Sequence, residues 1–321
     1  MWRLPSTRVS ARSARPSSYP RVRTHPPAAT NGPAKERLGL VLGFVGVAMF
    51  AATLPATRIA VGELAPEVVG LGRTLPAAGL AALYLVSVRA PRPSAPQLLR
   101  LAVTALGVVF GFPLLTALAM REVDATHGGV VLAVLPLTTA VFGAWLGRER
   151  PSPTFWILAA MGAVCVAVFS ILSGAGTVTT GDLYLAGAAL AGGLGYAMGG
   201  VLAREMPGLD VIAWALVLSL PALIPIGMWL WPRVDWAAGT ETWLAFAYVA
   251  VGSQFLGFYF WYGGLALGGI ARVSQLQLLQ TFLTLILAAL LLGETIDGQA
   301  LGFAALTVSL VWLGRRARVA R

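Results

Sequence analysis

Long apolar runs, separated by short polar connections, dominate the chain from residue 38 onward. A helix needs about 20 mostly apolar residues to cross the hydrocarbon core of a bilayer. The connections are rich in Pro, Gly and charge, as at 89–93 and 150–153. The pattern predicts an all-α integral membrane protein with ten transmembrane helices, at residues 38–57, 67–88, 98–119, 127–146, 154–172, 182–203, 210–231, 242–266, 273–292 and 298–314.

The same membrane unit occurs twice along the chain. The ends of two long apolar runs, at 147–149 and 292–294, each finish with glutamate and lie 145 residues apart. A Thr-Leu-Pro motif at 74–76 recurs at the same offset as Ser-Leu-Pro at 219–221. Because each copy holds five spans, an odd number, the second copy must be inverted relative to the first. We therefore predict two inverted five-helix repeats, an arrangement typical of transport, with boundaries at residues 38–173 and 174–314.

Composition and charge support a bilayer location. Hydrophobic residues make up 57% of the chain, charged residues 11%, and the mean hydropathy is +0.78, whereas a soluble domain carries roughly 25% charged residues. With a cytoplasmic N-terminus, all of the 23 basic residues except Arg58, Arg73, Arg121 and Arg233 lie on the inner side. This bias predicts a multi-pass cell-membrane protein with both termini cytoplasmic. The net charge of +10 thus reflects topology and does not indicate nucleic-acid binding.

Two basic tails flank the repeats. Residues 1–37 are rich in Arg, Ser and Pro and contain no apolar run, so we expect this segment to be disordered. Its composition fits either a dispensable basic tail or an organelle transit peptide. Residues 315–321 form a second basic tail, predicted to be cytoplasmic. The single cysteine, Cys165, lies within a span and excludes an internal disulfide.

Several short motifs, taken in order, carry a family resemblance. They are the opening of the first span at 50–58, Arg73 in the second span, the stretch from Leu135-Pro136 to Glu149, and the segments 269–277 and 291–294. This set resembles the EamA-type branch of the drug/metabolite transporter superfamily.

The resemblance implies secondary transport through a central cavity between the two bundles. A small organic metabolite, such as an amino acid or derivative or a drug-like solute, would move by alternating access, with export as the usual direction. In one departure from the family pattern, Thr281 stands where proline is usual in the ninth span. A proline kink like that of Pro136 is therefore expected only in the first copy.

Arg73 lies about six residues, or roughly 9 Å, inside the second span. Because an arginine at a helix centre costs about 2.5–3.5 kcal/mol, it normally faces a cavity or a partner. Two interpretations are open. Arg73 holds a substrate carboxylate or phosphate, or it pairs with Glu63, Glu67 or backbone carbonyls and fixes packing.

The ninth span carries a polar stripe. Ser274, Gln277, Thr281 and Thr284 recur at spacings of 3, 4 and 3, so they share one helical face, which Gln280 flanks. Since lipid offers these groups no hydrogen-bond partner, the face should point into the bundle. It either lines a cavity or holds helices together.

The eighth span combines the amide of Gln254 with the rings of Phe258, Trp261 and Tyr262, and Phe255 and Tyr259 lie beside them. Such a wall suits an amphipathic or zwitterionic organic solute, with stacking or cation–π contact to its amine; the alternative is an aromatic belt at the membrane interface. The candidate substrate-binding residues are Arg73, Tyr196, Trp214, Gln254, Tyr259, Ser274, Gln277 and Thr281.

Catalytic chemistry has little support in the sequence. The two histidines, His25 and His127, lie in the tail and at a span start, and no span holds paired acids. We therefore expect no enzymatic activity, metal or cofactor. The expected partners are a small-molecule substrate and the lipid bilayer. A noncatalytic membrane scaffold or receptor is the alternative function.

Overall fold

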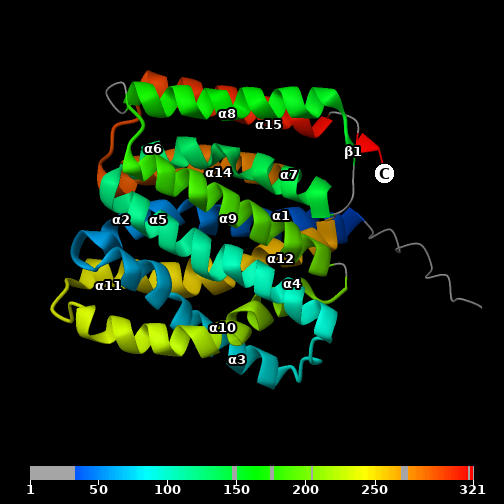
Figure 1. Cartoon of the computed structure of the whole chain (residues 1–321), viewed down its shortest axis with the longest axis vertical. Helices are drawn as coiled ribbons and strands as arrows, with labels where there is room; N and C mark the ends of the chain where they lie inside the picture. The colour runs from blue at the N-terminus through cyan, green and yellow to red at the C-terminus, as the bar shows by residue number, and fades with distance from the viewer. Residues whose placement is uncertain are drawn as a thin grey trace, which may run out of the picture.

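The structure is a computed structural model that describes residues 33–146, 150–173, 177–203, 205–268, 274–316 and 319–320. These residues are helical apart from connecting loops and one antiparallel pair of two-residue strands, β1 (Arg150–Pro151) and β2 (Val319–Ala320) (Figure 1). The tail at residues 1–32 lies outside the described residues. The first helix begins at Pro33, ahead of the expected start at residue 38, with proline at a position that suits a helix N-terminus.

The helices follow the order that the apolar runs predict. In the first half they are α1 (Pro33–Ala51), α2 (Thr53–Glu63), η1 (Val68–Gly72), α3 (Thr74–Ser87), α4 (Ala95–Ala105), η2 (Leu106–Gly111), α5 (Phe112–Glu122), α6 (Ala125–Val131), η3 (Leu132–Val134), α7 (Leu135–Leu146) and α8 (Pro153–Ser173). In the second half they are α9 (Thr180–Leu202), α10 (Gly208–Leu230), η4 (Trp231–Arg233), α11 (Thr240–Ala247), η5 (Tyr248–Gly257), α12 (Phe258–Gly268), η6 (Ser274–Gln277), α14 (Leu278–Leu292) and α15 (Gly298–Arg316).

Eight continuous helical stretches among the described residues are long and apolar enough to cross a membrane. They correspond to the first eight predicted spans. The ninth and tenth predicted spans contain the shorter apolar helices Leu278–Leu292 and Gly298–Leu310. The helical membrane architecture is thus confirmed, while the count of ten spans stays a prediction.

Local sequence signals explain where several helices begin and end. Ser94 and Gln97 form a capping box that starts α4, and Thr179 and Asp182 form another that starts α9. Gly293 ends α14 in the left-handed conformation (φ 69°), which glycine adopts at little cost.

Helices from the two halves of the chain interleave. Each of α1, α3, α7 and α8 packs against a helix of the second half: α12, α10, α9 and α15, respectively (Figure 1). Glycines permit the closest crossings, since a Cβ built on Gly107 would lie 2.7 Å from the Cα of Gly195, and one on Gly264 2.5 Å from the nitrogen of Gly43. These glycines therefore serve close helix packing.

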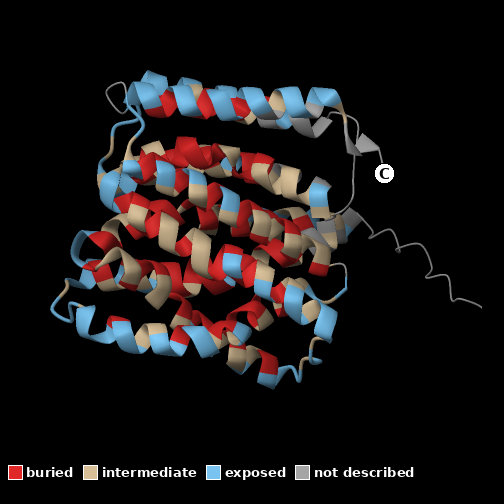
Figure 2. Ribbon diagram, in the orientation of Figure 1, coloured by how far each residue is buried: buried red, intermediate tan, exposed pale blue. Residues whose placement is uncertain are grey.

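Burial follows the expectation for a bundle in lipid. Buried residues face the interior, and exposed residues cover the outward surfaces, most extensively on α8 and α15 (Figure 2). Large apolar side chains are among the exposed ones, including Trp145, Met228 and Leu290. A soluble protein rarely exposes so many, so this surface is suited to acyl chains.

Polar contacts tie helix ends together at one end of the bundle. Arg58 donates to the Met120 carbonyl and pairs with Asp124 at 3.2 Å. The Glu294 carboxylate accepts hydrogen bonds from the backbone N–H groups of Ala125 and Thr126, at 2.9 and 2.7 Å, at the start of α6. Glu294 therefore caps a helix of the other half of the chain. Its counterpart, Glu149, lies outside the described residues.

Candidate functional site

Two small pockets adjoin each other inside the bundle and share Leu54, Leu132 and Gln280. The first, called here the central pocket, is a cavity of about 30 Å³ lined by Phe50, Thr53, Leu54, Arg73, Val108, Phe112, Leu132, Tyr196, Ser253, Gln254, Phe258 and Gln280. The second, the α14 pocket, has a volume of about 20 Å³ and is lined by Leu54, Gly129, Leu132, Ala133, Leu135, Pro136, Gln277, Leu278, Gln280, Thr281, Thr284 and Val308.

Each volume has room for only one or two water molecules, because a cavity needs about 10–15 Å³ to hold one. An organic solute therefore enters only if the surrounding helices move apart. The structure represents a closed form of the site.

Three π-helical segments border the central pocket. η1 ends immediately before Arg73, η2 contains Val108, and η5 contains Ser253 and Gln254. A π segment adds a residue to a helical turn and shifts the carbonyl hydrogen-bond pattern, and such segments are frequent at functional sites. One consequence is direct here: Gln254 Nε2 donates to the Val108 carbonyl at 2.8 Å, joining η5 to η2 across the pocket.

Arg73 is the charged side chain of the central pocket. Its exposed fraction is 1%, and its Nε and Nη1 atoms are buried with no hydrogen-bond partner among the described residues. Among the described residues, neither Glu63 nor Glu67 forms an ion pair with Arg73. The Glu63 carboxylate instead accepts from the Gly239 N–H at 2.7 Å and the Thr242 hydroxyl at 2.8 Å. The guanidinium thus has donors available at a cavity surface.

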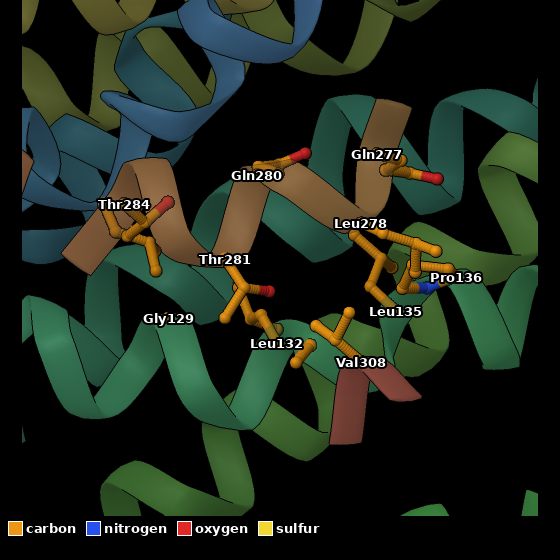
Figure 3. A pocket seen from close by; sticks show the side chains of 12 residues that line it. Gly129, Leu132, Leu135, Pro136, Gln277, Leu278, Gln280, Thr281, Thr284 and Val308 are labelled. Carbon is orange, nitrogen blue, oxygen red and sulfur yellow. The ribbon is translucent and has the colours of Figure 1, made fainter. Parts of the chain in front are cut away.

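The polar stripe of the ninth span meets the α14 pocket. Gln277, Gln280, Thr281 and Thr284 all line it, and Thr281 points across toward Leu132 (Figure 3). Thr284 also donates to the Ala51 carbonyl at 3.0 Å. The stripe therefore both lines a cavity and holds helices together. The side chain of Ser274 lies outside the described residues.

A short 3-10 segment occurs in the corresponding span of each half of the chain, and in the ninth span it contains Ser274 and Gln277 of the stripe itself. η3 lies just before Pro136, and η6 lies before Thr281. The prediction of a proline kink concerned Pro136 alone, and the 3-10 segment of the second copy forms without proline.

The aromatic wall is built mainly from three rings. Phe258 packs edge-on against Phe50, with ring centroids 5.1 Å apart, and lies 5.9 Å from Tyr196. Trp261 is buried in the same hydrophobic cluster and does not line either pocket. The alternative of an interfacial belt does not fit this buried position.

Two candidates from the sequence lie elsewhere. Tyr259 is 49% exposed on the outside of the bundle and contacts Phe260, so its assignment to the pocket was wrong. Neighbouring helical residues differ by about 100° in direction, and Phe258 occupies the inward direction. Trp214 is partly buried against the hydrophobic cluster and lines neither pocket.

Pairs of residues 146 positions apart surround the central pocket. These pairs are Phe50 with Tyr196, Val108 with Gln254, and Phe112 with Phe258. The pocket thus lies where the two halves of the chain meet in equivalent positions. Sequence reasoning missed Phe112, although the same offset applied to Phe258 identifies it. Thr53 and Ser253, whose hydroxyl oxygens are 2.7 Å apart, carried no comparable signal.

A helical bundle with an apolar outer surface, whose two halves enclose a cavity lined by a few polar side chains, is typical of a membrane transporter. Comparison with known proteins agrees: the chain belongs to the EamA-like transporter family, whose family model matches residues 37–171 and 179–314. The resemblance to the EamA-type branch is thereby confirmed.

One relative and one solved structure illustrate the match. A Bacillus subtilis (strain 168) protein described as "Uncharacterized transporter YdeK" is 46% identical over 258 residues, covering 80% of this chain and 90% of the relative. A crystal structure of a protein covers 87% of this chain and 98% of its own, with a TM-score of 0.58 and 23% identity. At that identity the structural likeness supports the fold alone.

Proposed function

We propose that this protein is a secondary transporter that moves a small organic metabolite through the central pocket by alternating access. The observation that carries the proposal is the buried guanidinium of Arg73, whose free donors face a cavity between the two halves of a membrane transporter fold. A buried ionisable group inside a membrane bundle is costly, and such groups mark substrate pathways.

We further propose that the two predicted repeats are inverted and that transport runs outward. With both termini cytoplasmic, the N-terminal end of α14 lies at the inner side. The α14 pocket is lined there by Gln277 and Leu278, which suits loading of substrate from the cytoplasm. Closing the inner side and opening the side held by Glu294 would then release it.

Counterflow in proteoliposomes tests the transport function. The purified full chain is reconstituted, and a panel of labelled amino acids, organic acids and amines is offered to vesicles preloaded with the same unlabelled compounds. We expect at least one class to exchange at a rate above that of protein-free vesicles. Accumulation in inside-out but not right-side-out membrane vesicles would support export, and the reverse would contradict it.

Two substitutions connect transport to the site. Arg73→Leu and Gln277→Leu should each reduce exchange at least tenfold, while the melting temperature stays within a few degrees, because leucine removes a buried polar group. Arg92→Leu and Gln299→Leu, at exposed positions, are matched controls that should exchange normally. If a site variant transports normally, or loses transport only by unfolding, that residue belongs to packing. If no compound exchanges with the wild type, the scaffold alternative gains support.

A further inference from the structure

The charges around the central pocket are unbalanced. Among the residues that line the central and α14 pockets, Arg73 is the only Asp, Glu, Lys, Arg or His. Arginine stays protonated in proteins and cannot shed its charge when buried. Within the described part of the chain, no carboxylate makes a hydrogen bond or ion pair with this guanidinium.

Acidic residues lie at the ends of the spans. The sequence has no Asp or Glu between residues 68 and 121, which surround Arg73, or between 242 and 293, which form the facing wall. Carboxylates near the helix ends are already bound there: Asp182 to His127 at 2.7 Å, Asp210 to Tyr84 at 2.9 Å, and Glu294 to the start of α6. A substrate that carries a negative charge would supply the balance that these carboxylates do not.

The second half of the chain contributes no matching cation. The residue equivalent to Arg73 at an offset of 145 is Leu218, which is 38% exposed on the uninterrupted helix α10. The π segment η1 precedes Arg73, and its extra residue turns the following side chain relative to a regular helix. The pocket thus contains one positive charge that the equivalent position of the second half does not match.

We infer that the substrate is an amphipathic monoanion, a carboxylate with an apolar body, and not a zwitterionic amino acid or an amine. Guanidinium donors suit a carboxylate, and the rings of Phe50, Phe258 and Tyr196 suit an apolar body. An amino acid would also bring an ammonium group, which no described carboxylate of either pocket can balance. This inference rests on the proposed transport function and narrows its substrate class.

Matched ligands separate charge from shape. Each of three triads contains a carboxylate, an amino acid and an amine with the same apolar group. The triads are 3-phenylpropionate, phenylalanine and phenethylamine; indole-3-propionate, tryptophan and tryptamine; and 4-methylpentanoate, leucine and isoamylamine. Affinities of the detergent-purified full chain are measured by ligand-dependent thermal stabilisation. We expect at least one carboxylate to bind at least tenfold more tightly than the amino acid and the amine of its triad. Equal or tighter binding of the zwitterion or amine in the best-bound triad, or no binding of any carboxylate, would overturn the inference.

Variants at Arg73 assign the preference to its charge. Arg73→Leu should abolish the carboxylate preference, Arg73→Lys should retain part of it, and Arg92→Leu should leave it unchanged. If Arg73→Leu does not fold, the ratios of the wild type and Arg73→Lys still decide the outcome. A carboxylate preference that survives in folded Arg73→Leu would also overturn the inference.

Counterflow distinguishes a failure of the monoanion inference from a failure of the proposed transport function. Exchange of amino acids or amines with no exchange of carboxylates would leave transport standing and overturn the monoanion. Absence of exchange for all nine compounds and the wider panel would instead overturn the proposed transport function.

Discussion

Replacing Gly264 with alanine tests the close crossing of α12 and α1. An ideal Cβ at this position would lie 2.5 Å from the Gly43 nitrogen, 2.7 Å from its Cα and 2.9 Å from the Gly39 carbonyl oxygen. All three are backbone atoms, so no side chain can rotate away and the helices must separate. Overpacking of this kind costs about 1–3 kcal/mol.

Helix propensity acts in the opposite direction and requires a matched control. Alanine in a helix interior is favoured over glycine by roughly 0.5–1 kcal/mol. Gly79 in α3 is suitable, because a Cβ there would meet nothing within 4 Å. Gly79→Ala should therefore be neutral or stabilising, and Gly264→Ala should be less stable than Gly79→Ala by about 1–3 kcal/mol, since the propensity gain cancels in the comparison.

The free energy of unfolding is measured for both variants and the wild type by reversible unfolding in one detergent. The melting temperature of each protein is then measured as well. A Gly264→Ala protein as stable as Gly79→Ala would refute the backbone contact between α12 and α1. A loss of stability in Gly264→Ala but not in Gly79→Ala would support this contact.

Two further predictions concern topology and acid sensitivity. Single cysteines at Arg121 and Arg233, in a Cys165→Ala background, should react with an impermeant thiol reagent from outside intact cells; protection of both positions would show that the assumed orientation is reversed. The Arg100 guanidinium lowers the pKa of Glu205 below its ordinary value of 4.5, with a further contribution from Gln97. The stabilisation from this exposed pair is therefore present above pH 4.5 and is lost as the pH falls through the lowered pKa. Glu205→Gln should show less acid-induced loss of melting temperature than the wild type at low salt, and an identical loss in both proteins would count against the pair.

The sequence predicts the fold far better than the directions of individual side chains. Apolar runs locate the helices because lipid requires long apolar surfaces, and helical spacing correctly groups Gln277 with Thr281. The π segments have no such periodic signal. Their extra residues change which side chains face inward, so the sequence placed both Phe258 and Tyr259 at the site. Contacts between distant helices, such as Gln254 with the Val108 carbonyl, depend on tertiary packing and could not be predicted from either span alone.

The asymmetry between Arg73 and Leu218 leads to a last prediction. If only the presence of a cation near the central pocket mattered, moving the arginine to the equivalent position of the other half would preserve transport. The helix that carries Leu218 lacks a π segment, and the side chain is 38% exposed on the outer surface. An arginine placed there would face the lipid and not the pocket. The double variant Arg73→Leu/Leu218→Arg should therefore remain as defective in solute exchange as Arg73→Leu alone. Recovery of exchange in the double variant would mean that both positions reach one cavity, and the role assigned to the π segment before Arg73 would be wrong.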